Sequence, residues 1–154
     1  MAGSRRRSYC ADVAKASKGV EYLATVPLFA GLSTDELAQV VQAADEIDAP
    51  AGEVLVAEGR VGREFFLILT GEAVVQRAGQ EIVALGPGQW FGELSLLDNQ
   101  PRSATVQAVT DMKLLVLGQG EFAGLLENIP AIASKLLKTM ARRLREADAR
   151  AATG

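Results

Sequence analysis

The chain has 154 residues, with 16 basic and 19 acidic side chains, a formal net charge of −3 and no histidine. Its 49% hydrophobic and 23% charged residues are typical of an ordinary globular protein long enough for one domain with a core. The slight acidity argues against a nucleic-acid binder. No apolar run approaches the ~18 residues of a membrane helix, and the single Cys10 cannot form an internal disulfide. We therefore expect a cytoplasmic protein.

The absence of histidine removes the commonest general base and the commonest metal ligand. The sequence also lacks HExxH and Gly-x-Ser-x-Gly motifs. We therefore predict no catalytic residues, no metal site and no cofactor, and an enzyme is the least favoured of three hypotheses.

Residues 1–18 form a basic arm, which we expect to be flexible, and residues 19–154 form the predicted single domain. The arm contains Arg5-Arg6-Arg7-Ser8, which is either a plain positive tail or a site for a basophilic kinase. Within the domain we assign residues 19–44 to N-terminal helices, 45–118 to a β-barrel and 119–151 to C-terminal helices.

The N-terminal part predicts a short helix within Val20–Phe29, broken before Pro27, and then a clearer helix. Ser33 is the expected N-cap of that second helix, and Glu36 three residues later completes a capping box. Its apolar face consists of Leu37, Val40, Val41 and Ala44.

The middle of the chain changes to the alternation typical of strands, with glycine or proline in nearly every gap. The expected strands are Val54–Ala57, Phe65–Thr70, Ala73–Arg77, Glu81–Leu85, Ala104–Val109 and Lys113–Leu117. Short strands at this spacing predict a mainly β sandwich or jelly-roll barrel. A helical segment between Phe91 and Asn99 interrupts them.

The C-terminal part is helical again, with a short helix over Glu121–Glu127 and a longer one from Pro130 to about Arg150. Apolar residues of the longer helix alternate in steps of four and three, at Ala133, Leu137, Met140, Leu144, Ala147 and Ala151. That spacing is typical of a two-stranded seam and favours a homodimer. The alternative is a single apolar face that packs within the monomer.

Residues 86–106 carry most of the functional information. Gly92-Glu93 begins a short helix, whose first amides suit an anion. Arg102 can hold two phosphate oxygens, and Ser103 adds a hydroxyl beside it. Taken singly, Glu93 could favour a helix start, Arg102 could be a solvated charge and Ser103 a turn residue. Their joint occurrence favours a sugar-phosphate site.

This segment resembles the phosphate-binding cassette of the cyclic nucleotide-binding domain family. Phe91-Gly92-Glu93-Leu94-Ser95-Leu96, followed by Pro101-Arg102-Ser103-Ala104-Thr105, matches the family pattern in order and spacing. The resemblance implies an eight-stranded jelly-roll β-barrel (a double-stranded β-helix) with N-terminal helices and two C-terminal helices.

The resemblance also implies the ligand contacts. Glu93 would take the ribose 2′-hydroxyl, and Arg102 would pair with the cyclic phosphate, helped by Ser103 and the amides of residues 93–95. The implied ligand-binding set is Gly92, Glu93, Leu94, Ser95, Arg102, Ser103 and Ala104. Because Ser103 is serine, as in bacterial cAMP-binding activators, we expect cAMP in preference to cGMP.

Contacts to the base are less defined. Ile82 and Val83 are candidate apolar contacts, and Arg143 and Ala147 on the last helix are candidate lid residues. Residues Met140–Leu144 are similar to the dimer helix of bacterial catabolite activators, where a threonine at the place of Ala147 hydrogen-bonds adenine. Alanine cannot make that bond, so the residue that caps the base stays open.

The sequence therefore predicts a cyclic nucleotide sensor whose last helix transmits occupancy to an unknown protein partner in trans. Because Gly154 follows Arg150 by only four residues, we expect no helix-turn-helix after it. The alternative is a protein-interaction domain of the same fold that binds no nucleotide.

Overall fold

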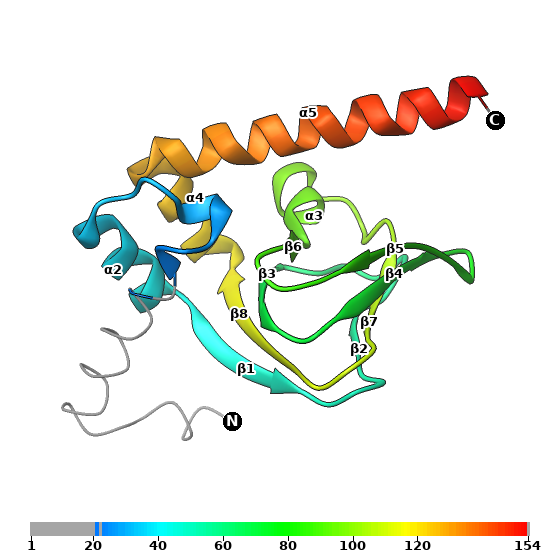
Figure 1. The fold of residues 1–154 in the computed structure, drawn as a ribbon, viewed down its shortest axis with the longest axis horizontal. Coiled ribbons are helices and arrows are strands. Elements are labelled where there is room, and N and C mark those ends of the chain that lie inside the picture. Colours follow the sequence, from blue (N-terminus) through cyan, green and yellow to red (C-terminus); the bar gives the residue numbers. More distant parts are fainter. Residues whose placement is uncertain (1–20, 22, 154) are drawn as a thin grey trace. The chain divides into compact units, whose positions relative to one another are not determined.

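The computed structural model describes residues 21 and 23–153, and Figure 1 shows its ribbon. Helical elements are η2 Pro27–Phe29, α2 Thr34–Ala43, α3 Glu93–Asp98, α4 Gln119–Asn128 and α5 Pro130–Thr153. Strands are β1 Asp45–Ala49, β2 Val54–Val56, β3 Glu64–Thr70, β4 Ala73–Arg77, β5 Gln80–Leu85, β6 Trp90–Phe91, β7 Thr105–Ala108 and β8 Met112–Gly118. No described helix has the length and hydropathy to cross a membrane.

The described chain forms two compact units, one over residues 40–123 and one that combines residues up to 39 with those from 124 onward. The first contains all eight strands, in two antiparallel four-stranded sheets. One sheet has the order β1-β8-β3-β6 and the other β2-β7-β4-β5. This arrangement confirms the predicted mainly β jelly-roll fold. The predicted division into an arm at 1–18 and a domain at 19–154 stays a prediction.

The core of the strand unit lies between the two sheets, because alternate residues of each strand point inward. Phe66 on β3 is paired in register with Phe91 on β6, and their rings stack with centroids 4.8 Å apart. On the other sheet, Val75 of β4 lies opposite Val106 of β7. The buried members of this core are Ala49, Val56, Phe66, Ile68, Ala73, Leu85, Phe91, Val106, Ala108, Met112 and Leu114.

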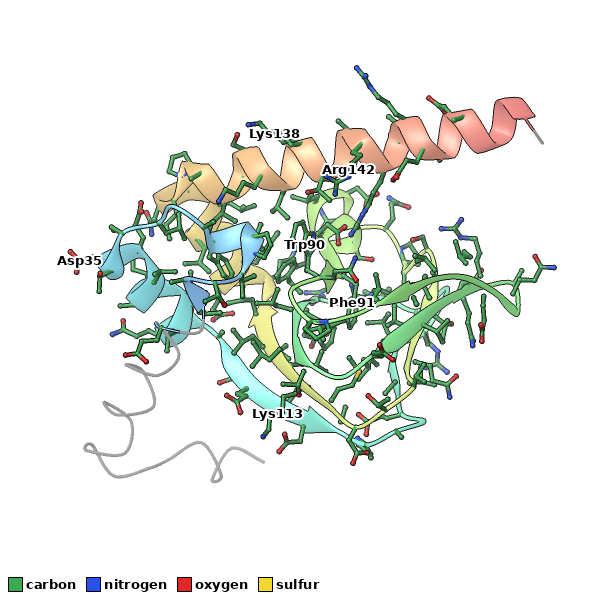
Figure 2. All side chains as sticks on the ribbon, viewed as in Figure 1. Asp35, Trp90, Phe91, Lys113, Lys138 and Arg142 are labelled. Carbon is green, nitrogen blue, oxygen red and sulfur yellow. The ribbon has the colours of Figure 1, made fainter. Side chains whose placement is uncertain are left out.

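The outer face of the β1-β8-β3-β6 sheet is partly covered by a helix and partly exposed to solvent. On the covered part, Phe65 of β3 stacks on Phe122 of α4, with ring centroids 4.7 Å apart. On the exposed part, Lys113 of β8 lies within 3.2 Å of Asp48 and 3.9 Å of Glu46 on β1 (Figure 2). These exposed ion pairs contribute little to stability but are compatible with a solvated edge.

The predicted capping box at the start of α2 is confirmed. The amide of Glu36 donates to the Ser33 hydroxyl at 3.1 Å, and the amide of Ser33 donates to Glu36 Oε1 at 2.9 Å. The predicted short helix before Pro27 falls partly outside the described residues, since Val20 and Tyr22 are not described. Glu21 and Leu23 are helical, and Pro27 begins the 3-10 turn η2.

The sequence missed two strands. In β1, Asp45, Glu46 and Asp48 hide the alternation, although Ile47 packs against the core and Ala49 is buried within it. β6 has only two residues, too few for a periodic signal. The six strands that were predicted agree with the structure to within one residue at each end.

The C-terminal helices also agree with their predictions, with α5 extending to Thr153. Lys135 of α5 donates from Nζ to the carbonyl of Pro27 at 3.1 Å and also to that of Ala30. This side chain therefore holds the η2 turn against α5 inside the second unit.

Candidate functional site

The side chain of Arg102 is the centre of the candidate site. Although arginine is mostly found exposed, its side chain is only 4% exposed here. Nη1 donates to the carbonyl of Gly92 and Nη2 donates to the carbonyl of Glu64, each at 2.9 Å. The guanidinium therefore bridges the residue that precedes α3 and the first residue of β3.

The backbone of Arg102 is fixed as well. Its amide donates to the carbonyl of Arg60 at 2.8 Å, and its own carbonyl accepts from the amide of Gly59 at 2.8 Å. These two bonds tie the segment before β7 to the loop between β2 and β3. Four hydrogen bonds thus fix the position of this one residue.

Two glycines make room for the guanidinium. A Cβ on Gly62 would lie 2.5 Å from Cζ of Arg102, and nearer still to Nε and Nη2. A Cβ on Gly92 would lie 2.8 Å from Nη1 of Arg102 and 2.6 Å from the carbonyl oxygen of Glu64. Gly92 also has φ +95°, a conformation that side chains rarely adopt. Any larger residue at position 62 or 92 would therefore displace the guanidinium from this place.

Two carboxylates balance the buried charge. Glu64 Oε1 lies 3.8 Å from Arg102 Nη2, with the Glu64 side chain half exposed. Glu93 is buried. Desolvation lowers the pKa of Arg102, while the nearby charges of Glu64 and Glu93 raise it. The arginine accordingly stays charged inside the protein.

One of the three guanidinium nitrogens, Nε, has no partner. Arg102 Nε is buried and makes no hydrogen bond among the described residues. An unpaired buried donor is costly and calls for an explanation by function, water or an ion. Nε is therefore the donor that a bound anion could use without breaking an existing bond.

The cassette helix itself agrees with its prediction. Gly92 is the residue before α3, and Asn99 ends the helix in the left-handed region with φ 58°. Ser95 is buried and its carbonyl accepts from the amide of Asn99 at 3.0 Å. The side chain of Leu94 lies outside the part that can be described.

Ser103 and Ala104 follow Arg102 at the surface. Ser103 is exposed, and its carbonyl accepts from Nε of Arg77 on β4 at 3.1 Å. Glu58 supports the same corner, because its Oε1 accepts from the amide of Ala78 and its own amide donates to Thr105 Oγ1, each at 2.9 Å. The Arg102–Ser103 backbone is thus held from both the β2–β3 loop and the β4–β5 turn.

The two candidate base contacts, Ile82 and Val83, differ in their places on β5: Val83 is paired with a core residue, and Ile82 is a bulge residue. Val83 lies opposite Val75, which packs against the core, so both point to the inside of the sandwich. Val83 nevertheless remains 48% exposed, so the inside is open to solvent at this point. Ile82 is 45% exposed and is the extra residue of a β-bulge between the pairs 75–83 and 76–81.

The predicted lid residues lie on α5. Ala147 is exposed and Arg143 is half-buried. Both belong to the second unit, and their relation to the cassette stays a prediction.

A cavity of about 130 Å³ lies beside the cassette. It is lined by residues 61–63, Ser95, Asn99, Gln100 and Gln119. Of the predicted ligand-binding residues only Ser95 contributes to it, so this cavity is not the space in front of Arg102. Among the described residues no group of three His, Cys, Asp or Glu side chains could hold a metal ion.

Sequence reasoning missed Gly62, Glu64 and Arg77. Each belongs to a segment that is distant in sequence from the cassette, and each touches it only through the fold. The one available signal was Gly62, a glycine just before a predicted strand. A single glycine, however, does not reveal which distant side chain lies against it.

The family relationship follows from comparison with known proteins. Residues 46–129 match the family model described as "Cyclic nucleotide-binding domain". The chain is 38% identical over 127 residues to the cyclic AMP receptor protein of Thermus thermophilus, covering 79% of this chain and 59% of that protein. It is 41% identical over 107 residues to the cAMP-dependent protein kinase regulatory subunit of Aspergillus niger, covering 68% of this chain and 26% of that one.

The structural comparison agrees. The crystal structure of the Thermus thermophilus catabolite activator protein superposes with a TM-score of 0.74 at 37% identity, covering 80% of this chain and 61% of that one. The chain therefore belongs to the cyclic nucleotide-binding domain family, which confirms the predicted resemblance. It spans about three fifths of the Thermus relative and about a quarter of the Aspergillus one.

We predict that Gly62→Ala destabilises the protein, because the new methyl group would occupy the space of the Arg102 guanidinium. Overpacking of this kind typically costs about 1–3 kcal/mol of unfolding free energy. Gly86→Ala is the matched control, since a Cβ there would meet no atom within 4 Å. Urea unfolding measures both variants, and equal stabilities would contradict the described position of Arg102.

Proposed function

We propose that the chain binds a cyclic nucleotide, with cAMP preferred over cGMP, and acts as a regulatory module. The observation that carries the proposal is the buried Arg102, fixed by four hydrogen bonds and left with one unpaired donor at Nε. A cyclic phosphate is a monoanion whose exocyclic oxygens accept such charge-assisted bonds. Ser103, exposed directly after Arg102, supplies a hydroxyl for the same phosphate.

The sugar and base have candidate partners in the same unit. Glu93 is the buried one of the two carboxylates near Arg102 and, in this proposal, accepts from the ribose 2′-hydroxyl. The base lies against the inside of the sandwich at Val83, with Ile82 beside it. An apolar side chain that points inward but stays half exposed suits the face of a purine.

The preference for cAMP is supported by the relatives, which are named as a cyclic AMP receptor protein and a cAMP-dependent protein kinase regulatory subunit. Residue 103 is serine rather than threonine, as expected of a cAMP-binding member. We propose that the chain has no catalytic activity of its own, since Glu93 is the only carboxylate of the cassette next to the phosphate position and the ribose occupies it.

In this proposal, nucleotide binding is signalled through α5 to a separate protein in the cytoplasm. Arg143 or Ala147 of α5 would lie near the base. Such a response is a population shift whose size is limited by the difference in nucleotide affinity between two states. In this proposal, residues 19–154 act as one domain and residues 1–18 as an arm.

A second function has its own supporting observation. Both Nη groups of Arg102 are already paired with backbone carbonyls, and the Glu64 carboxylate lies 3.8 Å away. The arginine can therefore serve as a purely structural tie. In that case the domain is a protein-interaction module that binds no nucleotide.

Titration calorimetry of the full chain with cAMP and cGMP distinguishes the two functions. We expect cAMP to bind, and Arg102→Lys to weaken it by roughly 10–100-fold, since a hydrogen bond to a charged group contributes about 1.5–3 kcal/mol. Lysine retains the charge but cannot present the guanidinium fork.

Arg60→Lys is the control for that experiment, because it makes the same change on an exposed side chain of the neighbouring loop. Its affinity for cAMP should equal that of the unaltered chain. Binding of neither nucleotide would leave the interaction module as the function.

The role of Glu93 is tested by measuring the affinities for cAMP and 2′-deoxy-cAMP in both the unaltered chain and the Glu93→Gln variant. We expect the unaltered chain to lose about tenfold or more in affinity when cAMP is replaced by 2′-deoxy-cAMP, because a charge-assisted bond is lost. Glu93→Gln should bind cAMP more weakly and lose little further with the deoxy ligand. If the deoxy penalty is the same in both proteins, Glu93 does not contact the ribose.

We also propose a homodimer through α5. Leu137 and Leu144, seven residues apart on one side of the helix, are 65% and 64% exposed. Burial of such a pair in a two-stranded seam would remove both side chains from water.

Light scattering after size exclusion should therefore give a dimer mass for the unaltered chain and a monomer mass for Leu144→Glu. Lys138→Gln changes the charge by the same one unit at an exposed position on another side of α5, and it should leave the dimer intact. A monomer mass for the unaltered chain at every concentration tested would refute the dimer.

A further inference from the structure

The cavity beside the cassette is a separate feature of the strand unit. Its walls come from the β2–β3 loop at residues 61–63, from the end of α3 at Ser95, Asn99 and Gln100, and from Gln119 at the start of α4. Its volume of about 130 Å³ is enough for several water molecules or a small ion. Arg102, Glu93 and Ser103 do not line it, and Ser95 is the one proposed nucleotide-binding residue that does.

The polar groups around this cavity include several hydrogen-bond donors beside the amide oxygens of Gln100 and Gln119. Ser95 is a buried residue that lines the cavity, and its hydroxyl can donate a hydrogen bond. Gln119 Nε2 donates to Asn99 Oδ1 at 3.1 Å, which leaves the amide NH2 of Asn99 available to donate.

The charge of the cavity is positive. Arg63 is the one ionisable side chain among the lining residues, and it makes no ion pair or hydrogen bond with any described residue. No carboxylate contributes to the wall. A guanidinium, a hydroxyl and an amide NH2 around one small space are groups that recognise an oxyanion.

We propose that this cavity is a second anion site, which takes a small tetrahedral oxyanion such as inorganic phosphate. Arg63 binds two of its oxygens from the open side, and the Ser95 hydroxyl donates to it from the buried side. The site does not depend on the proposed nucleotide binding, because Ser95, the one residue named for both, would contact the nucleotide through its backbone amide and the oxyanion through its hydroxyl.

The two anion positions are nevertheless adjacent. Gly62 lines the cavity, and the same residue lies against Nε and Cζ of Arg102. The charge of Arg102 is offset by Glu64 and Glu93, so Arg63 is the charge that attracts an anion to the cavity.

Nitrogen–proton correlation spectra of the nucleotide-free full chain, titrated with inorganic phosphate at constant ionic strength, test this site. We expect saturable shifts of the amides of residues 61–63 and 99–100, with one affinity. Arg63→Ala should weaken that affinity tenfold or more. Arg60→Ala removes an equally exposed arginine from the same loop, outside the cavity wall, and should leave the affinity unchanged.

Shifts that do not saturate, or equal affinities in the two variants, would mean an adventitious ion only and would overturn the proposal. Because no nucleotide is present, the outcome is separate from that of the cAMP titration. A chain that binds phosphate here but not cAMP would retain this site and lose the proposed function.

Discussion

The burial of one guanidinium determines the geometry of the candidate site. A buried cation is expensive unless its donors are paired, and Arg102 has two donors on backbone carbonyls and two carboxylates nearby. One carbonyl belongs to Gly92, which precedes α3, and the other to Glu64, which begins β3. The arginine therefore sets where β3, α3 and the segment before β7 meet, and a side chain at residue 62 or 92 would conflict with it.

The same arrangement limits what the site can bind. Arg102, Glu64 and Glu93 together carry a local charge of −1, so a cyclic phosphate would enter against a small negative excess. Glu64 is the group able to relieve this, because its side chain is half exposed and its ion pair with Arg102 is long, at 3.8 Å. Turning that carboxylate toward water costs little in a solvated setting. Glu93 is buried and has no such freedom.

Local sequence signals predicted what depends on local contacts. The capping box of Ser33 and Glu36 involves residues three apart, and the cassette helix begins at a glycine that the motif itself contains. Gly62, Glu64 and Arg77 were missed because their contacts with the Arg102–Ser103 segment span 26 to 40 residues of chain. The acidic strand β1 was missed because its inward residues, Ile47 and Ala49, are outnumbered by charges.

The unpaired Nε of Arg102 separates a structural tie from a ligand-binding group. A tie would be most stable with every donor paired, since a buried unsatisfied donor has the full cost of its desolvation. Here the remaining donor faces the backbone of Gly62, where a methyl group would already collide. A purely structural tie would gain stability from pairing this donor. An unpaired donor on an arginine that is otherwise fixed by four hydrogen bonds therefore favours a site that is completed by an anion.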